Sequence, residues 1–572
     1  MIIRQRQFDE KIVSELIALG THPLLARLYA ARGVVSKSEL ETSLSGIVPP
    51  EQLTNAGKMA KLLADGIAKG KKILVIGDYD ADGATATAVA VKGLRSMGAQ
   101  VDFLVPNRFE YGYGLTPEIV ALAATLLPDI LITVDNGIAS VDGVEAANLL
   151  GLQVLITDHH LPADSTPKAA CIVNPNQHGC DFTSKNLAGV GVMFYVLLAL
   201  RAELRSRNAF ENRLEPNLTE LLDLVALGTV ADLVKLDANN RILVEQGLRR
   251  IRAGACCAGI TALLKVAGKS PDKVTSQDLG FYVGPRLNAA GRLDDMRLGI
   301  ACLLAETEAD AMQKAQTLHE LNMERRNIEA EMQDSALISL ENIEVAEQYS
   351  LSIYAADYHQ GVIGILASRL KERYHRPVIV FANAGIVFAD AGEEILKGSG
   401  RSIAGLHLRD VLDLITKRHP SLILKFGGHA MAAGLSIKQA DFLAFQNAFE
   451  AVTRELLSEA DLQAVMETDG NLDANDISLQ TAWVLSSGVW GQGFPQPLFN
   501  DNFKVINQRV VGEKHLKLIL EKEQKRFDAI YFNCIDNLSE NISAVYAMEA
   551  NEYKGLQTVQ LQVKQIIHDN IT

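Results

Sequence analysis

The sequence predicts an α/β protein that contains a parallel sheet, a second α/β domain and a C-terminal all-β barrel. Short apolar, β-rich runs alternate with helical stretches over about 51–305, which is typical of βαβ units and a mainly parallel sheet. A second alternation covers about 346–455, and about 456–572 consists mostly of short strand-like runs. Because 572 residues exceed what one hydrophobic core holds, we expect several domains.

The first α/β domain is predicted over 51–305, after an N-terminal helical segment, 1–50, that ends at Pro49 and Pro50. Its apolar runs are expected to be strands buried on both faces of the sheet, at 71–77, 101–106, 129–135 and 152–158. Helices are expected at 84–98 and 117–127. Ligands of such sheets bind outside the carboxyl ends of the strands, so that edge is the place to look for a site.

One long helix, over about 306–345, is predicted to link the two α/β domains. Residues 300–360 contain neither glycine nor proline, and residues 307–342 mix apolar and charged residues at helical spacing. A coiled coil is the competing interpretation, but the heptads are poor.

The remaining domains are predicted from further β-rich runs. In the second α/β domain, 346–455, the first strands are expected at 351–357 and 377–383. In the C-terminal region, 456–572, such runs occupy 503–511, 515–521, 529–534 and 556–567. Many short strands with a basic run favour a small OB-like barrel, a fold that commonly binds oligonucleotides.

Composition predicts a soluble, cytoplasmic protein. Apolar residues make up 48% of the chain and charged residues 22%, which is ordinary for a globular protein. The six cysteines form no CxxC pair, which suggests neither a zinc ribbon nor a disulfide framework and fits a reducing compartment. The N-terminus lacks the apolar core of a signal peptide, and no uncharged apolar stretch is long enough to span a membrane.

The formal net charge of −14 argues mildly against a nucleic-acid partner, but two stretches have the opposite sign. Residues 397–425 carry six Lys or Arg against two Asp, and residues 504–526 carry seven against three Glu, a net +4 in each case. Two solvated surfaces are the competing interpretation of these runs.

Acidic and imidazole side chains follow three of the predicted parallel strands. They are Asp78, Asp80 and Asp82 in "GDYDADG", Asp135 in "TVDNG", and Asp158, His159 and His160 in "TDHH". A further acid, Asp232, lies in "VADLV" after a helical stretch. We expect extended backbone to turn the first three aspartates to one side, and Gly83 to let the chain turn into the next helix.

Such a cluster of carboxylates is stable only if cations offset their repulsion. Carboxylates with one or two imidazoles suit Mg²⁺ or Mn²⁺, and the histidines favour Mn²⁺. The set exceeds the needs of one ion, so we expect two divalent cations roughly 3.5–4 Å apart, the clamp used to hydrolyse phosphate esters. Turn and capping residues at βα junctions are the competing interpretation, and four converging segments argue against it. The stretch "GDYDADG" matches no P-loop, dinucleotide fingerprint or EF-hand.

In this order the motifs resemble the DHH phosphoesterase superfamily. Later motifs narrow the resemblance to the RecJ family of bacterial single-strand-specific 5′→3′ DNA exonucleases. These motifs are "GPRLNAAGRLDD" (284–295), "HQGVIGILASRLKE" (359–372), "GSGRS" (398–402) and "GGHAMAAGL" (427–435). The resemblance covers nearly the whole chain and implies a DHH domain, a DHHA1 domain and an OB-fold.

The resemblance also implies roles for the clustered residues. Asp78 and Asp80 would hold one ion, Asp82, His159 and Asp232 the second, and Asp135 would bridge both; how the first three aspartates divide between the ions stays open. Asp158 would orient a ligand. His160 and His429 would face the phosphate, where the glycines before His429 suit anion binding.

Recognition of the 5′ end is assigned to other residues by the same resemblance. Arg108, Arg286, Ser399 and Arg401 would bind the terminal phosphate, since the planar fork of arginine pairs with phosphate oxygens. Asn288, in the same motif as Arg286, is also assigned to the substrate. Tyr111 and Tyr113 would stack on bases, although core packing is an equal alternative. The family's preference for single strands would come from a narrow gap between the two α/β domains.

The implied function is a processive, single-strand-specific 5′→3′ DNA exonuclease that releases 5′-mononucleotides in recombination and repair. The resemblance implies a single-strand-binding protein and a RecQ-type helicase as partners, and a monomeric state. A DHH nanoRNase, a cyclic-dinucleotide phosphodiesterase and a family II pyrophosphatase are alternatives against which the C-terminal barrel speaks. A non-catalytic DNA-binding scaffold is the remaining alternative, and the intact metal-site motifs argue against it.

Overall fold

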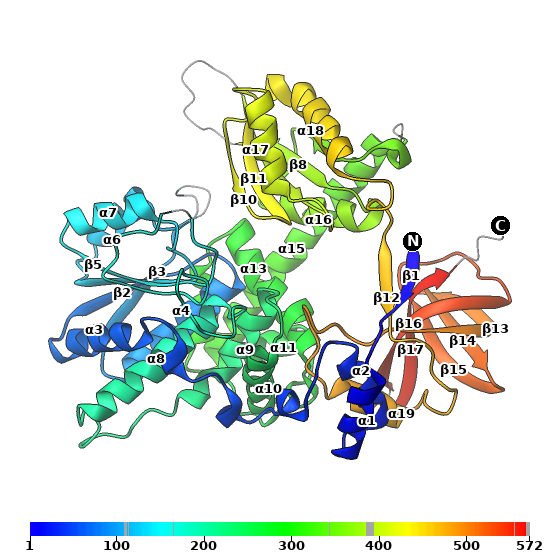
Figure 1. Cartoon of the computed structure of the whole chain (residues 1–572), viewed down its shortest axis with the longest axis horizontal. Coiled ribbons are helices and arrows are strands. Elements are labelled where there is room, and N and C mark those ends of the chain that lie inside the picture. The colour runs from blue at the N-terminus through cyan, green and yellow to red at the C-terminus, as the bar shows by residue number, and fades with distance from the viewer. Residues whose placement is uncertain are drawn as a thin grey trace. The chain divides into compact units, whose positions relative to one another are not determined.

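The structure is a computed structural model that describes residues 1–107, 111, 114–163, 165–341, 344–384, 394–553 and 555–567. These residues form two compact units (Figure 1). The larger unit contains Gln5–His319 and Glu467–Thr572, and the smaller unit contains Met1–Arg4 and Glu320–Met466. The finer division into five parts stays a prediction.

The larger unit is built on a five-stranded parallel sheet, as predicted. Its strands are β2 (Lys72–Ile76), β3 (Gln100–Leu104), β4 (Ile130–Val134), β5 (Gln153–Thr157) and β6 (Cys171–Val173), in the order β3-β2-β4-β5-β6. The chain runs from β2 to β3 on one side and then to β4 on the other, so the order reverses beside β2. A crevice forms at such a reversal point, outside the carboxyl ends of the strands. Asp78 and Asp135 follow the two strands that flank it.

Helices cover both faces of this sheet (Figure 1). Alternate strand residues such as Leu74 and Leu131 pack against Ile119 and Val144 of α6 (Pro117–Ala124) and α7 (Val141–Leu149). On the other face, α8 (Gly189–Ser206) packs on β4 and β5 and against α3 (Ala56–Ala68) and α4 (Ala81–Ser96). The sheet is therefore buried on both faces, which explains its continuous apolar runs.

A helical layer follows the sheet in the larger unit. Its main helices are α9 (Leu222–Ala231), α10 (Ala238–Arg252), α11 (Ala258–Val266), α13 (Gly284–Leu293) and α14 (Arg297–Leu304). A π-helix, η6 (Leu279–Val283), leads directly into α13. The 33-residue helix α15 (Glu308–Leu340) confirms the predicted long helix, and the boundary between the two units falls within it.

The smaller unit contains a mixed five-stranded sheet of order β10-β11-β9-β8-β7. Its strands are β7 (Leu351–Tyr354), β8 (Val378–Asn383), β9 (Ile395–Arg401), β10 (Lys425–Gly428) and β11 (Ala432–Lys438), and only β7 and β8 pair in parallel. The helices are α16 (Ile363–Tyr374), α17 (Leu408–Arg418) and α18 (Phe442–Leu456), of which α17 and α18 share a core with β8, β9 and β11.

The C-terminal strands form the predicted closed barrel, of order β13-β14-β15-β17-β16. They are β13 (Phe499–Val511), β14 (His515–Lys522), β15 (Lys525–Tyr531), β16 (Asn541–Tyr553) and β17 (Leu556–Ile567). A helix, α19 (Leu479–Ser486), precedes the barrel and contacts β16. Closure leaves the barrel without free edges.

The N-terminal segment contains one strand in addition to the expected helices. Strand β1 (Ile2–Gln5) pairs with β12 (Val465–Thr468), and α1 (Glu10–Ala18) and α2 (Pro23–Ala30) follow it. Buried Arg32 then makes two hydrogen bonds of 2.9 Å to buried Asp469, which ties the segment to the chain before the barrel. Among the described residues, no helix is long and apolar enough to cross a membrane.

Candidate metal centre

Helix α4 begins at Ala81, three residues earlier than the sequence suggested and inside the aspartate motif. Asp80 caps the helix, since its Oδ1 accepts hydrogen bonds of 2.9 Å from the backbone N–H groups of Asp82 and Gly83. Asp82 therefore lies in the first helical turn, and the expectation of an extended segment with three aspartates on one side was wrong. The capping bonds explain why, because they stabilise the helix from Ala81 onward.

Gly83 is required by close packing within this first turn. A Cβ atom there would lie 2.6 Å from Cβ of Asp78 and 2.7 Å from its carbonyl oxygen. Glycine thus lets the helix begin directly beside Asp78, which brings the end of β2 and the start of α4 together.

The buried carboxylate of Asp82 is held by the N-terminus of α8. Its Oδ2 accepts a hydrogen bond of 2.6 Å from the N–H of Gly189, and its Oδ1 one of 2.9 Å from the N–H of Val190. Helix N-termini favour negative charge. Gly189 also leaves room for Asp135, because a Cβ atom would lie 2.6 Å from Cβ and from Oδ1 of that residue. Asp135 itself has a φ of 62°, which turns its side chain out of the strand line.

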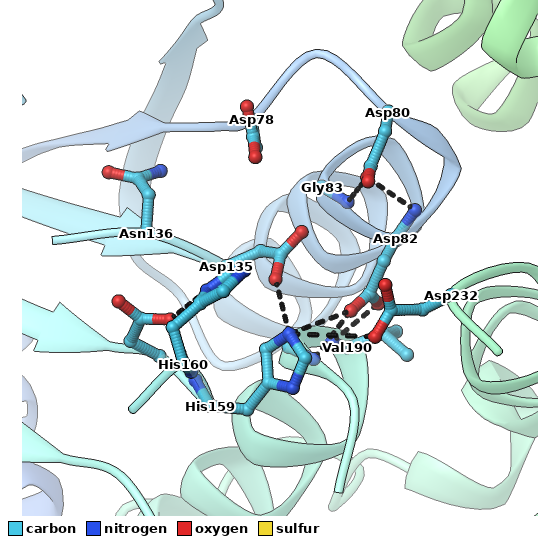
Figure 2. A network of polar contacts seen from close by, with 12 residues as sticks. Asp78, Asp80, Asp82, Gly83, Asp135, Asn136, His159, His160, Val190 and Asp232 are labelled. Atoms are coloured by element: carbon cyan, nitrogen blue, oxygen red, sulfur yellow. Dashed lines mark hydrogen bonds and ion pairs between the residues drawn. The ribbon is translucent and has the colours of Figure 1, made fainter. Parts of the chain in front are cut away.

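Three carboxylates surround one imidazole nitrogen at the strand ends (Figure 2). Nε2 of His159 lies 3.1 Å from Oδ1 of Asp135, 3.5 Å from Oδ2 of Asp232 and 3.9 Å from Oδ2 of Asp82. Asp78 and Asp80 lie on the other side of Asp135, and each of these two has an oxygen within 4.8 Å of a carboxylate oxygen of Asp135. The structure therefore brings together all six residues that the sequence assigned to the metal site: Asp78, Asp80, Asp82, Asp135, His159 and Asp232.

The chemistry of this cluster fits divalent cations. Oδ1 of Asp135 and Nε2 of His159 are buried and make no hydrogen bond to any described residue. Burial, reinforced by the charge of Asp80, raises the pKa of Asp82 to about 7. Burial and the neighbouring aspartates also raise the pKa values of Asp135 and Asp232 well above the ordinary value. Buried, mutually repelling oxygen ligands and an unsatisfied imidazole are what bound cations would compensate.

His159 is set up as a neutral ligand. Burial, with the charge of His160, lowers the pKa of His159 to about 4, so the imidazole ring is neutral at pH 7. A hydrogen bond with the backbone of Leu187 adds a contact for the ring. Metal-binding histidines are neutral and use their second nitrogen for such a bond.

Asp158 contacts the other histidine of the motif. Its Oδ1 lies 2.7 Å from Nδ1 of His160 and accepts a 2.7 Å hydrogen bond from the backbone N–H of His159. Its Oδ2 accepts a 2.8 Å bond from the N–H of Ile138. Burial lowers the pKa of His160, but the bond and charge of Asp158 outweigh that effect and raise it to about 9. Asp158 therefore orients the ring of His160 and the backbone of His159.

Helix α13 borders the aspartate loop of the larger unit. Oδ1 of Asn288 accepts a 2.8 Å hydrogen bond from the N–H of Ala81. Arg286 is mostly buried, donates to the carbonyl oxygen of Tyr282, and its Nε lies 3.2 Å from Nδ1 of His319. Asn288 thus contacts the metal loop directly.

The remaining predicted substrate residues lie in the smaller unit or outside the described residues. Ser399 and Arg401 belong to β9, and exposed His429 follows β10. Nη1 of Arg401 lies 3.3 Å from Oγ of Ser399, and no carboxylate among the described residues forms an ion pair with it. Arg108 and Tyr113 fall outside the described residues. Tyr111 packs against the core under α6 and α7, which agrees with core packing, the alternative to base stacking for this residue.

Asparagines support the site from beside the clustered residues, and sequence reasoning placed one of them, Asn136, at the strand ends but missed Asn176. Asn136 joins the ends of two strands, since its Nδ2 donates to the carbonyl oxygens of Ile76 and Val134. Asn176 donates a 2.7 Å hydrogen bond to the carbonyl oxygen of His159. Asn136 stands beside Asp135 in "TVDNG" and was expected at this edge of the sheet, although no role was assigned to it, whereas Asn176 and Gly189 have no ionisable side chain and follow no predicted strand of the site.

Three family models match successive parts of the chain. The N-terminal domain of the DHH family matches residues 72–229, the DHHA1 domain matches residues 347–457, and the RecJ OB domain matches residues 468–565. The first match contains the strand ends and most of the clustered residues described above.

The chain is also similar to whole proteins. It is 48% identical to the single-stranded-DNA-specific exonucleases RecJ of Salmonella typhimurium and Escherichia coli, over 99% and 100% of this chain and 98% of each relative. The crystal structure of RecJ in complex with Mn²⁺ from Thermus thermophilus superimposes with a TM-score of 0.82 at 28% identity, covering 99% of this chain and 80% of that one. The corresponding complex with Mg²⁺ gives a TM-score of 0.77 at 27% identity, covering 99% and 79%. The chain therefore belongs to the RecJ family of single-stranded-DNA-specific exonucleases.

Proposed function

We propose that this chain is a single-strand-specific 5′→3′ DNA exonuclease that releases 5′-mononucleotides by metal-dependent hydrolysis. The observation that carries the proposal is the convergence of buried Asp135 Oδ1 and His159 Nε2, 3.1 Å apart and without hydrogen bonds among the described residues. The names of the relatives, single-stranded-DNA-specific exonucleases, support DNA as the substrate. The solved Mn²⁺ and Mg²⁺ complexes of the Thermus relative support these two metals.

Two groups of ligands support two cation positions. The oxygens of Asp78, Asp80 and Asp135 lie within 4.8 Å of one another, and so do ligand atoms of Asp82, His159 and Asp232. We assign one ion to each group, with Asp135 between them. When bound, the cations would lower the pKa of an attacking water and stabilise negative charge on the phosphate.

The protein's own groups hold this arrangement in place. Both oxygens of Asp82 are fixed by the N-terminus of α8, so the carboxylate keeps one orientation without a cation. Asp158 fixes the ring of His160, which we assign to the scissile phosphate together with His429. Ligands that are already oriented need no rearrangement when the substrate arrives.

The 5′-terminal phosphate is assigned to the smaller unit, at Ser399 and Arg401. The start of α16 lies against this pair, since a Cβ atom on Gly364 would lie 2.9 Å from Oγ of Ser399 and 3.1 Å from Nη2 of Arg401. A partly buried arginine with no described acidic partner, a hydroxyl group and a helix N-terminus together suit a phosphate. Arg286 of the larger unit and Arg108 remain assigned to substrate by resemblance.

The cellular setting extends the proposal. Recombination and repair require single strands to be exposed, so we assign a RecQ-type helicase and a single-strand-binding protein as partners, and a monomer in the cytoplasm as the working form. These assignments depend on resemblance to the family.

Digestion of labelled oligonucleotides tests the proposal. Single-stranded and duplex DNA labelled at the 5′ or the 3′ end would be incubated with the protein and Mn²⁺ or Mg²⁺. We expect labelled mononucleotide to appear at once only from 5′-labelled single strands. Early release of the 3′ label would contradict the polarity, and equal digestion of blunt duplex would contradict the strand specificity.

A further inference from the structure

The π-helix η6, Leu279–Val283, carries two exposed aromatic side chains in the larger unit. Phe281 is 74% exposed and Tyr282 is 40% exposed, whereas Leu279 and Val283 of the same segment are buried. Single π-helical turns are rare overall but frequent at functional sites. We therefore ask what the two exposed aromatic rings could bind.

One side of this π-helix packs directly on the residues that precede Asp232. A Cβ atom on Gly280 would lie 3.1 Å from Cγ1 of Val230, and one on Gly284 would lie 3.1 Å from Cβ of Ala231. The two glycines therefore allow the backbone around Phe281 to lie against the end of α9. That end supplies Asp232 to the cluster around His159.

The helix that continues from η6, α13, contacts the aspartate loop of the metal centre. Asn288 of α13 accepts the N–H of Ala81 at 2.8 Å, between the two aspartates of the capped turn. A Cβ atom on Gly291 would lie 1.8 Å from the carbonyl oxygen of Tyr79, so this contact also requires glycine. Phe281 thus lies on a π-helix that packs against the end of α9 and continues into a helix that contacts the aspartate loop.

The two rings differ in what already covers them. The Nζ of Lys269 lies 4.0 Å from the ring centre of Tyr282 and forms an ion pair of 2.9 Å with Asp278, so Tyr282 has a cationic partner. Among the described residues, no aromatic or cationic side chain stacks on Phe281. Phe281 is therefore the ring that offers an open face.

We propose that Phe281 is a stacking platform for one base of the single-stranded substrate, which is an inference that depends on the proposed function. Arg286 lies on the same helical segment, where it donates to the backbone carbonyl oxygen of Tyr282, so a cation follows Phe281 closely along the chain. Alternating aromatic and cationic contacts suit a nucleic-acid strand, and stacking tolerates every base. A base in a duplex has both faces covered by its neighbours, so the same contact contributes to the preference for single strands.

A binding measurement tests the platform without hydrolysis. Oligonucleotides with 2-aminopurine at successive positions from the 5′ end would be titrated with the full-length protein in EDTA. We expect one position at which wild type quenches the fluorescence, loss of that quenching in Phe281→Ala, and its retention in Phe281→Tyr. Leu214→Ala, which removes another exposed apolar side chain, 94% exposed, serves as the matched control and should keep the wild-type profile.

Kinetics on strands that lack one base give a second, independent comparison. On normal single strands, we expect Phe281→Ala to lose roughly ten- to a hundredfold in kcat/KM, mainly through KM. When the mapped position carries an abasic site, wild type should lose the same factor and the variant should lose little more. Identical quenching profiles for wild type and Phe281→Ala would overturn the inference. Absence of nuclease activity in wild type would overturn the proposed function instead, while the quenching measurement would still decide the role of Phe281.

Discussion

Nε2 of His159 lies 3.1 Å from Oδ1 of Asp135, and neither atom makes a hydrogen bond to a described residue. Leaving two buried polar atoms unsatisfied costs stability, and so does the mutual repulsion of the surrounding carboxylates. This pair therefore links the stability of the larger unit to the binding of cations.

Metal removal should destabilise the protein measurably. We expect Mn²⁺ to raise the melting temperature of EDTA-treated protein, since a ligand at a hundred times its Kd contributes about 2.7 kcal/mol. Asp135→Asn should lose most of this shift because it removes the central carboxylate. Scanning fluorimetry with and without Mn²⁺ measures it, and Asp142→Asn, an exposed aspartate of α7, is the control. Equal shifts in the wild type and Asp135→Asn would contradict the assignment.

The metal-free protein should lose stability as the pH rises. Burial, with the charge of Asp80, raises the pKa of Asp82 in the folded protein to about 7, above the ordinary value of 3.8. A group with a raised folded pKa contributes stability that is fully present below the unfolded pKa and lost as the pH rises through the folded one. In EDTA, melting temperatures should therefore fall between about pH 4 and pH 7.

The control for this pH dependence is Asp82→Asn, which cannot ionise. Its melting temperature in EDTA should depend less on pH than that of wild type over the same range. An equal dependence in both proteins would show that other groups cause it. Saturating Mn²⁺ should reverse the trend in wild type, since cations compete with protons for the carboxylates.

Asp80 has two roles that different substitutions should separate. Asp80→Ala removes both the proposed cation ligand and the cap of α4, so we expect a nuclease loss of at least a hundredfold and about 1 kcal/mol of destabilisation. Asp80→Ser keeps a capping oxygen, so it should lose the nuclease activity and keep most of the stability. Nuclease assays and thermal melts measure the two effects. Asp9→Ala, which removes the cap of α1, should reduce stability alone. If Asp80→Ala digested single strands as fast as the wild type does, the metal assignment would be refuted.

Most of the metal cluster could be predicted from the sequence because parallel strands end at the same edge of a sheet. Asp78, Asp135 and His159 each follow an apolar run, so their convergence depends only on topology. The partners of Asp82 could not be predicted in this way. They are backbone N–H groups of Gly189 and Val190, 107 and 108 residues along the chain, and only tertiary packing brings them together.

The glycine-rich strand β9 and the π-helix η6 could not be predicted from the sequence, for two different physical reasons. Gly398 and Gly400 lie within β9, and glycine is normally depleted in strands. Here a Cβ atom on Gly398 would lie 2.6 Å from the ring of Phe381, so packing rather than propensity selects glycine. In η6 the helix contains about one more residue in its turn than an α-helix does, and so short a segment does not change the period of the apolar residues in the sequence.

Gly189 should be as sensitive as a metal ligand although it has no side chain. In Gly189→Ala the new Cβ would lie 2.6 Å from Oδ1 of Asp135, which forces that carboxylate or the start of α8 to move. We expect loss of nuclease activity by at least a hundredfold and a reduced thermal shift with Mn²⁺. Gly191→Ala on the same helix meets only the flexible end of Leu187, at 3.1 Å, and should keep most of the activity. Equal activity in both variants would argue against close packing at this site.

Arg401 should decide how well the protein distinguishes a 5′-phosphate from a 5′-hydroxyl group. Its guanidinium is partly buried beside Ser399, and this burial lowers the pKa of Arg401. Arg401→Ala should therefore lose roughly ten- to a hundredfold in kcat/KM on 5′-phosphorylated strands and less on strands that end in a hydroxyl group. Arg401→Lys should recover only part of the loss, since an ammonium group lacks the planar fork. Arg418→Ala removes an exposed arginine that pairs with Glu455 and should leave the preference intact. The same fractional loss on both kinds of end would place Arg401 elsewhere along the strand.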